Sequence, residues 1–251
     1  MKYVYGRVIV SGDVIEVYRY ERGYVRQVKK SVGRAGNGET LEYEKRKNRE
    51  TSLQRARGEI RRIINANFNR WGVVSKFVTL TFSDNIQDLS KANTMFRNFI
   101  KRLNYHVFNT KQSVVKYTAV VEFQKRGAVH YHVVFYNLPY ISNSLLRKIW
   151  GHGYVKINAV DNVDNVGAYV SKYLTKSNDD ERLKGHKCYF NSKGLRKPNE
   201  RVLNVREVEK ILGSLPSEAL VYESDYSNDY IGDVKYYQFN LKRKGVNYNV
   251  G

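Results

Sequence analysis

The chain has 251 residues, and its 44 Lys and Arg against 24 Asp and Glu give a formal net charge of +20 at pH 7. The length fits one large domain, or a core domain with extensions. The excess of positive charge favours a polyanionic partner, nucleic acid first, with a basic ribosomal-type or membrane-surface protein as the alternative. Cys188 is the only cysteine, which excludes an intrachain disulfide and fits a reducing compartment.

Membrane and secretory segments are not expected. No apolar run approaches the about 20 residues needed to span a bilayer, and the N-terminus lacks the apolar core of a secretory signal. We therefore expect a protein of the cytoplasm with no membrane partner. The chain also has no Gly-x4-Gly-Lys-[Ser/Thr] loop, so no P-loop ATPase is expected.

The first 72 residues predict strands followed by a basic helix. Strands are expected over 3–5, 8–10 and 14–18, with the turn Ser11-Gly12-Asp13 between the last two. After a glycine-rich break at 33–38, a proline-free stretch predicts a helix from Leu41 to about Phe68. Its basic residues, which include Arg61 and Arg62, form either a solvated face or a face that contacts phosphates.

The middle of the chain alternates between strand and helix patterns. We expect strands over 77–82, 114–123, 129–136 and 153–157, and helices over 86–106, 142–150 and 163–176. This order predicts an α+β fold, with helices packed on one face of an antiparallel sheet. Further on, we expect a helix over 205–212, with Asn204 as N-cap and Gly213 just past its end, and strands over 220–222 and 234–241.

The sequence His130-Tyr131-His132 places two imidazoles on one face of a predicted strand. If Lys125-Arg126-Gly127 is the turn of a hairpin, Glu122 lies opposite His130 on the same face. Two neutral imidazoles and one carboxylate suit a divalent cation: zinc can bind such a triad, and Mg²⁺ or Mn²⁺ is preferred where phosphate oxygens also bind. Histidines on a sheet are often simply hydrogen-bonded, but Lys125 and Arg126 beside the triad suit a phosphate substrate.

Two tyrosines follow at helical spacing. Tyr169 and Tyr173 lie at i and i+4 on one helix face, with Lys172 and Lys176 near it. A phenol has a pKa near ~10, and a nearby ammonium favours the phenolate that could attack a phosphodiester. Amphipathic packing is the more common reason for this spacing, so the pair alone does not establish nucleophiles.

Taken in order, three motifs resemble those of the HUH endonucleases, and more narrowly those of rolling-circle replication initiators of plasmids and small single-stranded DNA phages. They are Phe77-Val-Thr-Leu-Thr-Phe82, Glu122-Phe-Gln-Lys-Arg-Gly-Ala-Val-His130-Tyr-His132 and Tyr169-Val-Ser-Lys-Tyr173-Leu-Thr-Lys176. Two further stretches are also typical of the family: Trp150-Gly-His-Gly-Tyr-Val155 and Asn191-Ser-Lys-Gly-Leu-Arg-Lys-Pro198. The resemblance covers roughly residues 73–200.

The resemblance implies an antiparallel sheet with flanking helices, similar to an RNA-recognition or ferredoxin-like module. It also implies cleavage of single-stranded origin DNA through a 5′-phosphotyrosine link with a free 3′-hydroxyl. By position, His130, His132 and Glu122 would be the metal ligands, and Lys172 the basic residue beside the tyrosines. Tyr169 would be the nucleophile, and Tyr173 the second tyrosine of two-tyrosine initiators.

Partners and a division of the chain are also predicted. We expect host helicase and polymerase as partners, and DNA contacts from Lys125, Arg126, Lys176, Arg61 and Arg62. The expected divisions are N-terminal strands and a basic helix (1–72) that help to grip duplex DNA, an HUH catalytic core (73–203), and a C-terminal extension that packs on the core (204–251).

Other functions stay open at this point. A mobilisation relaxase or a transposase would use the same chemistry, and the site does not separate these from an initiator. A non-catalytic nucleic-acid-binding module is the alternative of a different class: its sheet tyrosines would stack on bases and its basic residues would hold phosphates. Metal-dependent cleavage distinguishes the two classes.

Overall fold

The computed structural model describes residues 3–25, 42–158, 165–176, 181–183 and 186–243, with the backbone alone for 42–49, 174–176 and 181. The chain divides into two compact units, which we call the terminal unit (residues 1–49 and 197–251) and the central unit (residues 50–196). Each unit contains a five-stranded antiparallel sheet, so the predicted α+β fold is confirmed. In the described residues, no helix is long and apolar enough to cross a membrane.

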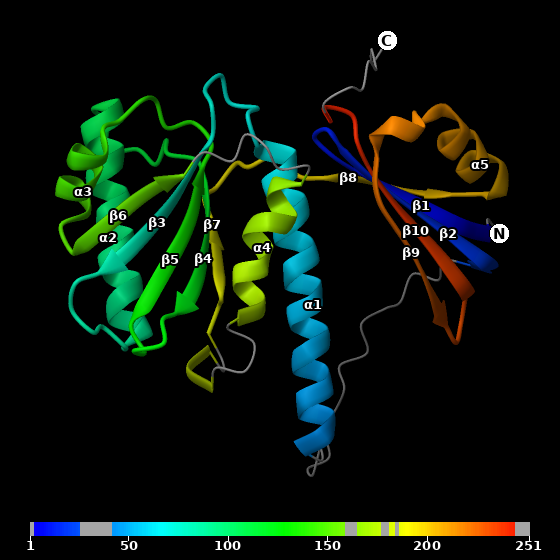
Figure 1. Cartoon of the computed structure of the whole chain (residues 1–251), viewed down its shortest axis with the longest axis horizontal. Helices are drawn as coiled ribbons and strands as arrows, with labels where there is room; N and C mark the ends of the chain where they lie inside the picture. The colour runs from blue at the N-terminus through cyan, green and yellow to red at the C-terminus, as the bar shows by residue number, and fades with distance from the viewer. Residues whose placement is uncertain (1–2, 26–41, 159–164, 177–180, 184–185, 244–251) are drawn as a thin grey trace. The chain divides into compact units, whose positions relative to one another are not determined.

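The terminal unit combines strands from both ends of the chain (Figure 1). Its sheet has the order β8-β1-β2-β10-β9, made of β8 (Asn199–Leu203), β1 (Tyr3–Ser11), β2 (Val14–Val25), β10 (Gly232–Asn240) and β9 (Leu220–Asn228). Helix α5 (Val205–Ser214) contacts β1, β2 and β8 and begins with a capping box between Asn204 and Glu207. A short 3-10 turn, η2 (Ser217–Ala219), leads into β9.

The sheet of the central unit has the order β6-β3-β5-β4-β7. Its strands are β3 (Lys76–Phe82), β4 (Tyr117–Phe123), β5 (Val129–Phe135), β6 (Gly153–Asn158) and β7 (Tyr189–Asn191). Helices α2 (Leu89–Phe108) and α3 (Asn143–Trp150) cover one face, where most large apolar side chains gather. Helices α1 (Glu42–Asn67) and α4 (Val166–Lys176) lie on the other face, and η1 (Glu181–Leu183) precedes β7 (Figure 1).

Two expectations about the helices need correction. Helices cover both faces of the central sheet rather than one, because α1 and α4 bury Ile60, Ile64 and Val170 against its second face. The helix expected over 205–212 continues to Ser214, so Gly213 lies inside it rather than past its end.

The units also differ from the divisions expected at 72 and 203. Strand β8 pairs with β1, β10 pairs with β2 and β9 pairs with β10, and α1 from Glu50 onward belongs to the central unit. Sequence periodicity identifies a strand but not its partner, and partners decide where a unit ends.

Candidate metal and tyrosine site

The register of β3, β4 and β5 brings the predicted triad together. Glu122 of β4 pairs directly with His130 of β5, as the hairpin predicted. On the other side of β5, Thr81 pairs with His130 and Thr79 pairs with His132. Side chains of directly paired residues project from the same face of a sheet, so these five polar side chains share the face on which α4 lies.

Tyr131, between the two histidines, faces the opposite layer. It is fully buried, its ring stacks on Phe96 with centroids 4.7 Å apart, and its hydroxyl donates to Asn93 Oδ1 over 2.7 Å. An aromatic residue at the middle position therefore anchors β5 to α2. This anchor fixes the strand from which both imidazoles project.

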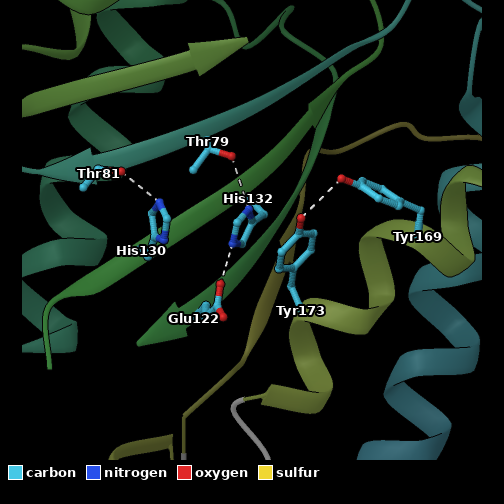
Figure 2. Close-up of polar contacts among 7 residues, drawn as sticks. All are labelled: Thr79, Thr81, Glu122, His130, His132, Tyr169 and Tyr173. Carbon is cyan, nitrogen blue, oxygen red and sulfur yellow. Dashed lines mark hydrogen bonds and ion pairs between the residues drawn. The ribbon is translucent and has the colours of Figure 1, made fainter. Parts of the chain in front are cut away.

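Glu122, His130 and His132 offer three ligand atoms that all lie within 4.8 Å of one another. His132 Nε2 is 2.6 Å from Glu122 Oε2, and these side chains are 5% and 14% exposed (Figure 2). Two imidazole nitrogens and one carboxylate oxygen form a borderline donor set that suits several divalent metals. The residues present therefore fit a divalent metal ion.

Two threonine hydroxyls orient the imidazoles from β3 (Figure 2). Thr81 Oγ1 is 2.9 Å from His130 Nε2, and Thr79 Oγ1 is 3.4 Å from His132 Nδ1. Each contact occupies one ring nitrogen and leaves the other, His130 Nδ1 and His132 Nε2, as the nitrogen for a metal. Such partners of a ligand's second nitrogen fix the ring orientation in metal sites.

His130 stays uncharged at neutral pH. Burial lowers its pKa to about 4, aided by the positive fields of His132 and Arg126 and opposed by Glu122. Metal ligation requires the neutral imidazole. The site therefore keeps this histidine in the form that can bind a cation.

Tyr173 lies directly on the triad. Its ring stacks on that of His132, with centroids 3.7 Å apart and an interplanar angle of 19°. Its hydroxyl donates to the hydroxyl of Tyr169 over a long 3.5 Å (Figure 2). Burial, the hydroxyl of Tyr169 and the charge of Glu122 all raise the pKa of Tyr173, so this phenol resists deprotonation.

Tyr169 lies further from the triad and closer to a cation. The Lys172 ammonium is 3.8 Å from the centroid of the Tyr169 ring and 5.4 Å from that of Tyr173. Phe77 contacts both tyrosines, edge-on to Tyr169 and stacked with Tyr173, at 5.8 and 5.9 Å between centroids. Both phenol rings are thus held against the sheet and half-buried.

Buried amides join the start of α4 to α1. Asn65 Nδ2 donates to Asn165 Oδ1 over 2.9 Å, and Asn65 Oδ1 accepts from the backbone N–H of Gly167 over 2.8 Å. Asn165 Oδ1 also accepts from the N–H of Ala168, which satisfies one of the free donors of the helix start. A Cβ on Gly167 would lie 2.1 Å from the carbonyl oxygen of Arg61, so α4 can approach α1 this closely only with glycine at this position.

The residues predicted to contact DNA differ in their exposure and in their hydrogen bonds. The Arg126 guanidinium donates to the carbonyl oxygens of Phe82 and Ser83, so it ties the β4–β5 turn to β3, whereas Lys125 is exposed in that turn. Arg61 and Arg62 are half-buried on α1. The side chain of Lys176 lies outside the described residues. A role for these five residues in binding DNA stays a prediction.

Sequence reasoning alone passes over the two threonines. Thr79 and Thr81 alternate with buried residues in Phe77-Val-Thr-Leu-Thr-Phe82, so they share one face of β3. Polar residues at every second position of an otherwise apolar central strand are the available signal. What the sequence could not supply is the pairing of β3 with β5.

The central unit is thus an antiparallel α+β fold with a two-histidine, one-carboxylate cluster beneath a helix that carries two tyrosines. Residues 75–178, which contain the cluster and both tyrosines, match the model of a family described as replication-associated protein ORF2. The match covers less than half of the chain and lies within the central unit. No curated protein and no solved structure matches the chain.

Proposed function

We propose that this protein is a rolling-circle replication initiator that nicks and rejoins single-stranded DNA at an origin. One observation carries the proposal: His132 contacts Glu122 on one side and the ring of Tyr173 on the other, inside the stretch that is similar to replication-associated proteins. The positive charge of the chain favours a DNA substrate. Unwinding and synthesis would fall to a host helicase and polymerase.

His130, His132 and Glu122 would hold the divalent metal, Mg²⁺ or Mn²⁺. When bound, this ion would supply Lewis-acid stabilisation of the charge that develops on the scissile phosphate. The chain contributes the arrangement of the ligands: Thr79 and Thr81 fix the imidazole orientations before any ion arrives. Preorganised ligands need no rearrangement when substrate binds.

Tyr169 is the nucleophile in this proposal. Its phenol loses a proton, its Oη forms a bond to phosphorus, and the bond from phosphorus to the 3′ oxygen breaks, so that the departing oxygen takes up a proton. The products are a 5′-phosphotyrosine and a free 3′-hydroxyl, and the reverse reaction rejoins the strand. The Lys172 ammonium lies closer to the Tyr169 ring than to the Tyr173 ring, and the raised pKa of Tyr173 disfavours that residue as the first attacker.

The test is formation of a covalent adduct. Wild-type protein is incubated with Mn²⁺ and labelled single strands that tile the replicon carrying the gene, and adducts are resolved on denaturing gels. We expect Tyr169→Phe to abolish the adduct, and Tyr140→Phe, which alters an 89% exposed tyrosine, to leave it intact. Mass spectrometry of the labelled peptide then identifies the attacking residue.

Two results would change the proposal. Adduct formation by Tyr169→Phe together with its loss in Tyr173→Phe would reverse the roles of the tyrosines. Salt-sensitive binding of the strands without a nick under any metal would favour a non-catalytic binding module instead.

A further inference from the structure

The edge strand β6 carries two side chains in the same cross-strand rows as the metal triad. Tyr154 pairs with Thr81, the partner of His130, and Lys156 pairs with Thr79, the partner of His132. Both side chains therefore start from the face that carries the triad. Val155, between them, is buried in the core on the opposite face, as strand alternation requires.

Among the described residues, this face is exposed to solvent at β6. Apart from Tyr173, which stacks on His132, the buried apolar side chains of α1 and α4 pack around Phe77, Val120 and Val134, toward the far end of the strands. On β6, Tyr154 is 60% exposed and Lys156 is also exposed. Within the described part of the chain no ion pair is formed by Lys156. Beside the triad, β6 thus presents an aromatic ring and a cation to solvent.

Tyr154 also lines an open pocket of about 490 Å³, together with Arg147 and Lys148 of α3 and with Ser83, Ser144, Gly151 and Gly153. The Arg147 guanidinium carbon is 4.8 Å from the centroid of the Tyr154 ring. The described lining contains no acidic side chain. The volume of the pocket falls within the range of roughly 300–1,000 Å³ that is typical of small-ligand sites, so one nucleotide fits.

The backbone at the start of β6 is built for this position. Gly153 has φ +142°, and a Cβ there would lie 2.4 Å from both Ser83 N and Thr81 O. Only glycine allows β6 to begin this close to the end of β3. The placement of the Tyr154 ring at the edge of the triad face depends on that approach.

We propose that Tyr154, Arg147, Lys148 and Lys156 form a subsite that holds one unpaired nucleotide of a DNA strand next to the metal triad. The base stacks on the exposed Tyr154 ring, and the flanking phosphates are held by the cations. An exposed aromatic ring with a guanidinium close to it, in a described pocket lining without a carboxylate, is a combination that binds single strands without reading their sequence. That the bound DNA is the strand to be nicked rests on the proposed function. Binding of an unpaired DNA strand at this subsite does not depend on that function.

The first test measures binding without chemistry. Full-length protein is titrated into a fluorescein-labelled, mixed-sequence single strand in EDTA, and anisotropy gives the Kd. We expect Tyr154→Ala to weaken binding by about tenfold, the loss typical of one stacked base, and Tyr154→Phe to retain affinity. The control is Tyr105→Ala, which removes a 57% exposed tyrosine on α2, the helix on the opposite face of the sheet. Equal affinities for Tyr154→Ala and Tyr105→Ala would overturn the subsite.

Lys156 has a separate signature. Because it contacts phosphate in this proposal, Lys156→Ala should lower the slope of log affinity against log salt by about 0.7, the value for one phosphate of a single strand. A wild-type slope in that variant would remove Lys156 from the subsite. Competition by an acidic peptide as effective as that of the unlabelled strand would assign the surface to protein instead of DNA.

A crosslinking experiment on the wild-type protein avoids dependence on folded variants. Strands that carry a single 5-iodouracil at successive positions are irradiated, and the crosslinked peptide is sequenced. Crosslinks at Tyr154 from one or two adjacent positions support the subsite, and their absence at all positions overturns it. If no nick forms but Tyr154→Ala still weakens binding, the nicking proposal fails while the subsite stands.

Discussion

The two units share the architecture of a five-stranded antiparallel sheet but differ in chemistry. Each has a five-stranded antiparallel sheet with helical cover, yet the three metal-type ligands gather only on the central sheet among the described residues. In the terminal unit, the buried carboxylate of Glu16 accepts a hydrogen bond from the Tyr236 hydroxyl over 2.9 Å. The Tyr236 ring packs against the ring of Tyr18. What differs is which side chains the register aligns. The chemistry of a site thus depends on which side chains the sheet carries and not on the sheet itself.

Charge is divided unequally between the units. In residues 50–196 the ratio of Lys and Arg to Asp and Glu is more than two to one. In residues 1–49 and 197–251 together the same ratio is less than three to two. A polyanion is therefore attracted more strongly to the unit that carries the triad and the tyrosines.

The largest effect is expected from His132→Ala. It removes a proposed metal ligand that also contacts Glu122 and the Tyr173 ring. Mn²⁺ affinity should therefore fall by about 100-fold or more, because loss of a ligand costs at least as much as the loss of about 10- to 100-fold that is typical when a ligand's hydrogen-bond partner is removed. Calorimetric titration of Mn²⁺ measures this. Unchanged affinity would mean that the ion binds elsewhere.

Asn65→Ala tests how α4 is held. It leaves the buried N–H of Gly167 without its acceptor, so the free energy of unfolding of the central unit should fall by about 2 kcal/mol. Urea denaturation measures this loss, and Asn65→Asp, which keeps an acceptor for Gly167, should lose less. Adduct formation should slow while Mn²⁺ affinity is kept; a matching loss of Mn²⁺ affinity would contradict a role confined to α4.

Thr81→Val preserves side-chain shape but removes the hydroxyl at 2.9 Å from His130 Nε2. We expect Mn²⁺ affinity to weaken by about tenfold, because the imidazole loses the partner that orients it. Thr79→Val, which removes the longer contact of 3.4 Å, should have a smaller effect in the same titration. The reverse order would show that hydrogen-bond length does not rank these partners.

Tyr236→Phe is the matched change in the other sheet. It removes the hydroxyl that donates to Glu16, and the free energy of unfolding should fall by about 1 kcal/mol. Mn²⁺ affinity and adduct formation should match those of the wild type. A loss of either would show that the terminal sheet contributes to metal binding or to cleavage.

The sequence predicted local structure well, because local structure depends on nearby residues. The hairpin register that sets Glu122 opposite His130 followed from strand parity and the turn at Gly127, which has φ +89°. Contacts between segments distant in the chain could not be predicted. The link from Asn65 to Asn165 and the pairing of Thr81 with His130 and Tyr154 depend on how helices and strands assemble.

The pairing of β1 and β2 with strands from the other end of the chain also affects the order in which the two units can fold during synthesis. On the ribosome, β1 and β2 emerge before the other described strands, and β8 and β10, which flank them in the sheet, are made about 190 and about 210 residues after β1 and β2 respectively. At roughly 5–20 residues per second, that interval is on the order of ten seconds or more. Strands β3 to β6 and helix α4, which carry the candidate site, are synthesised within it, so the site can assemble while the first hairpin still lacks both neighbours.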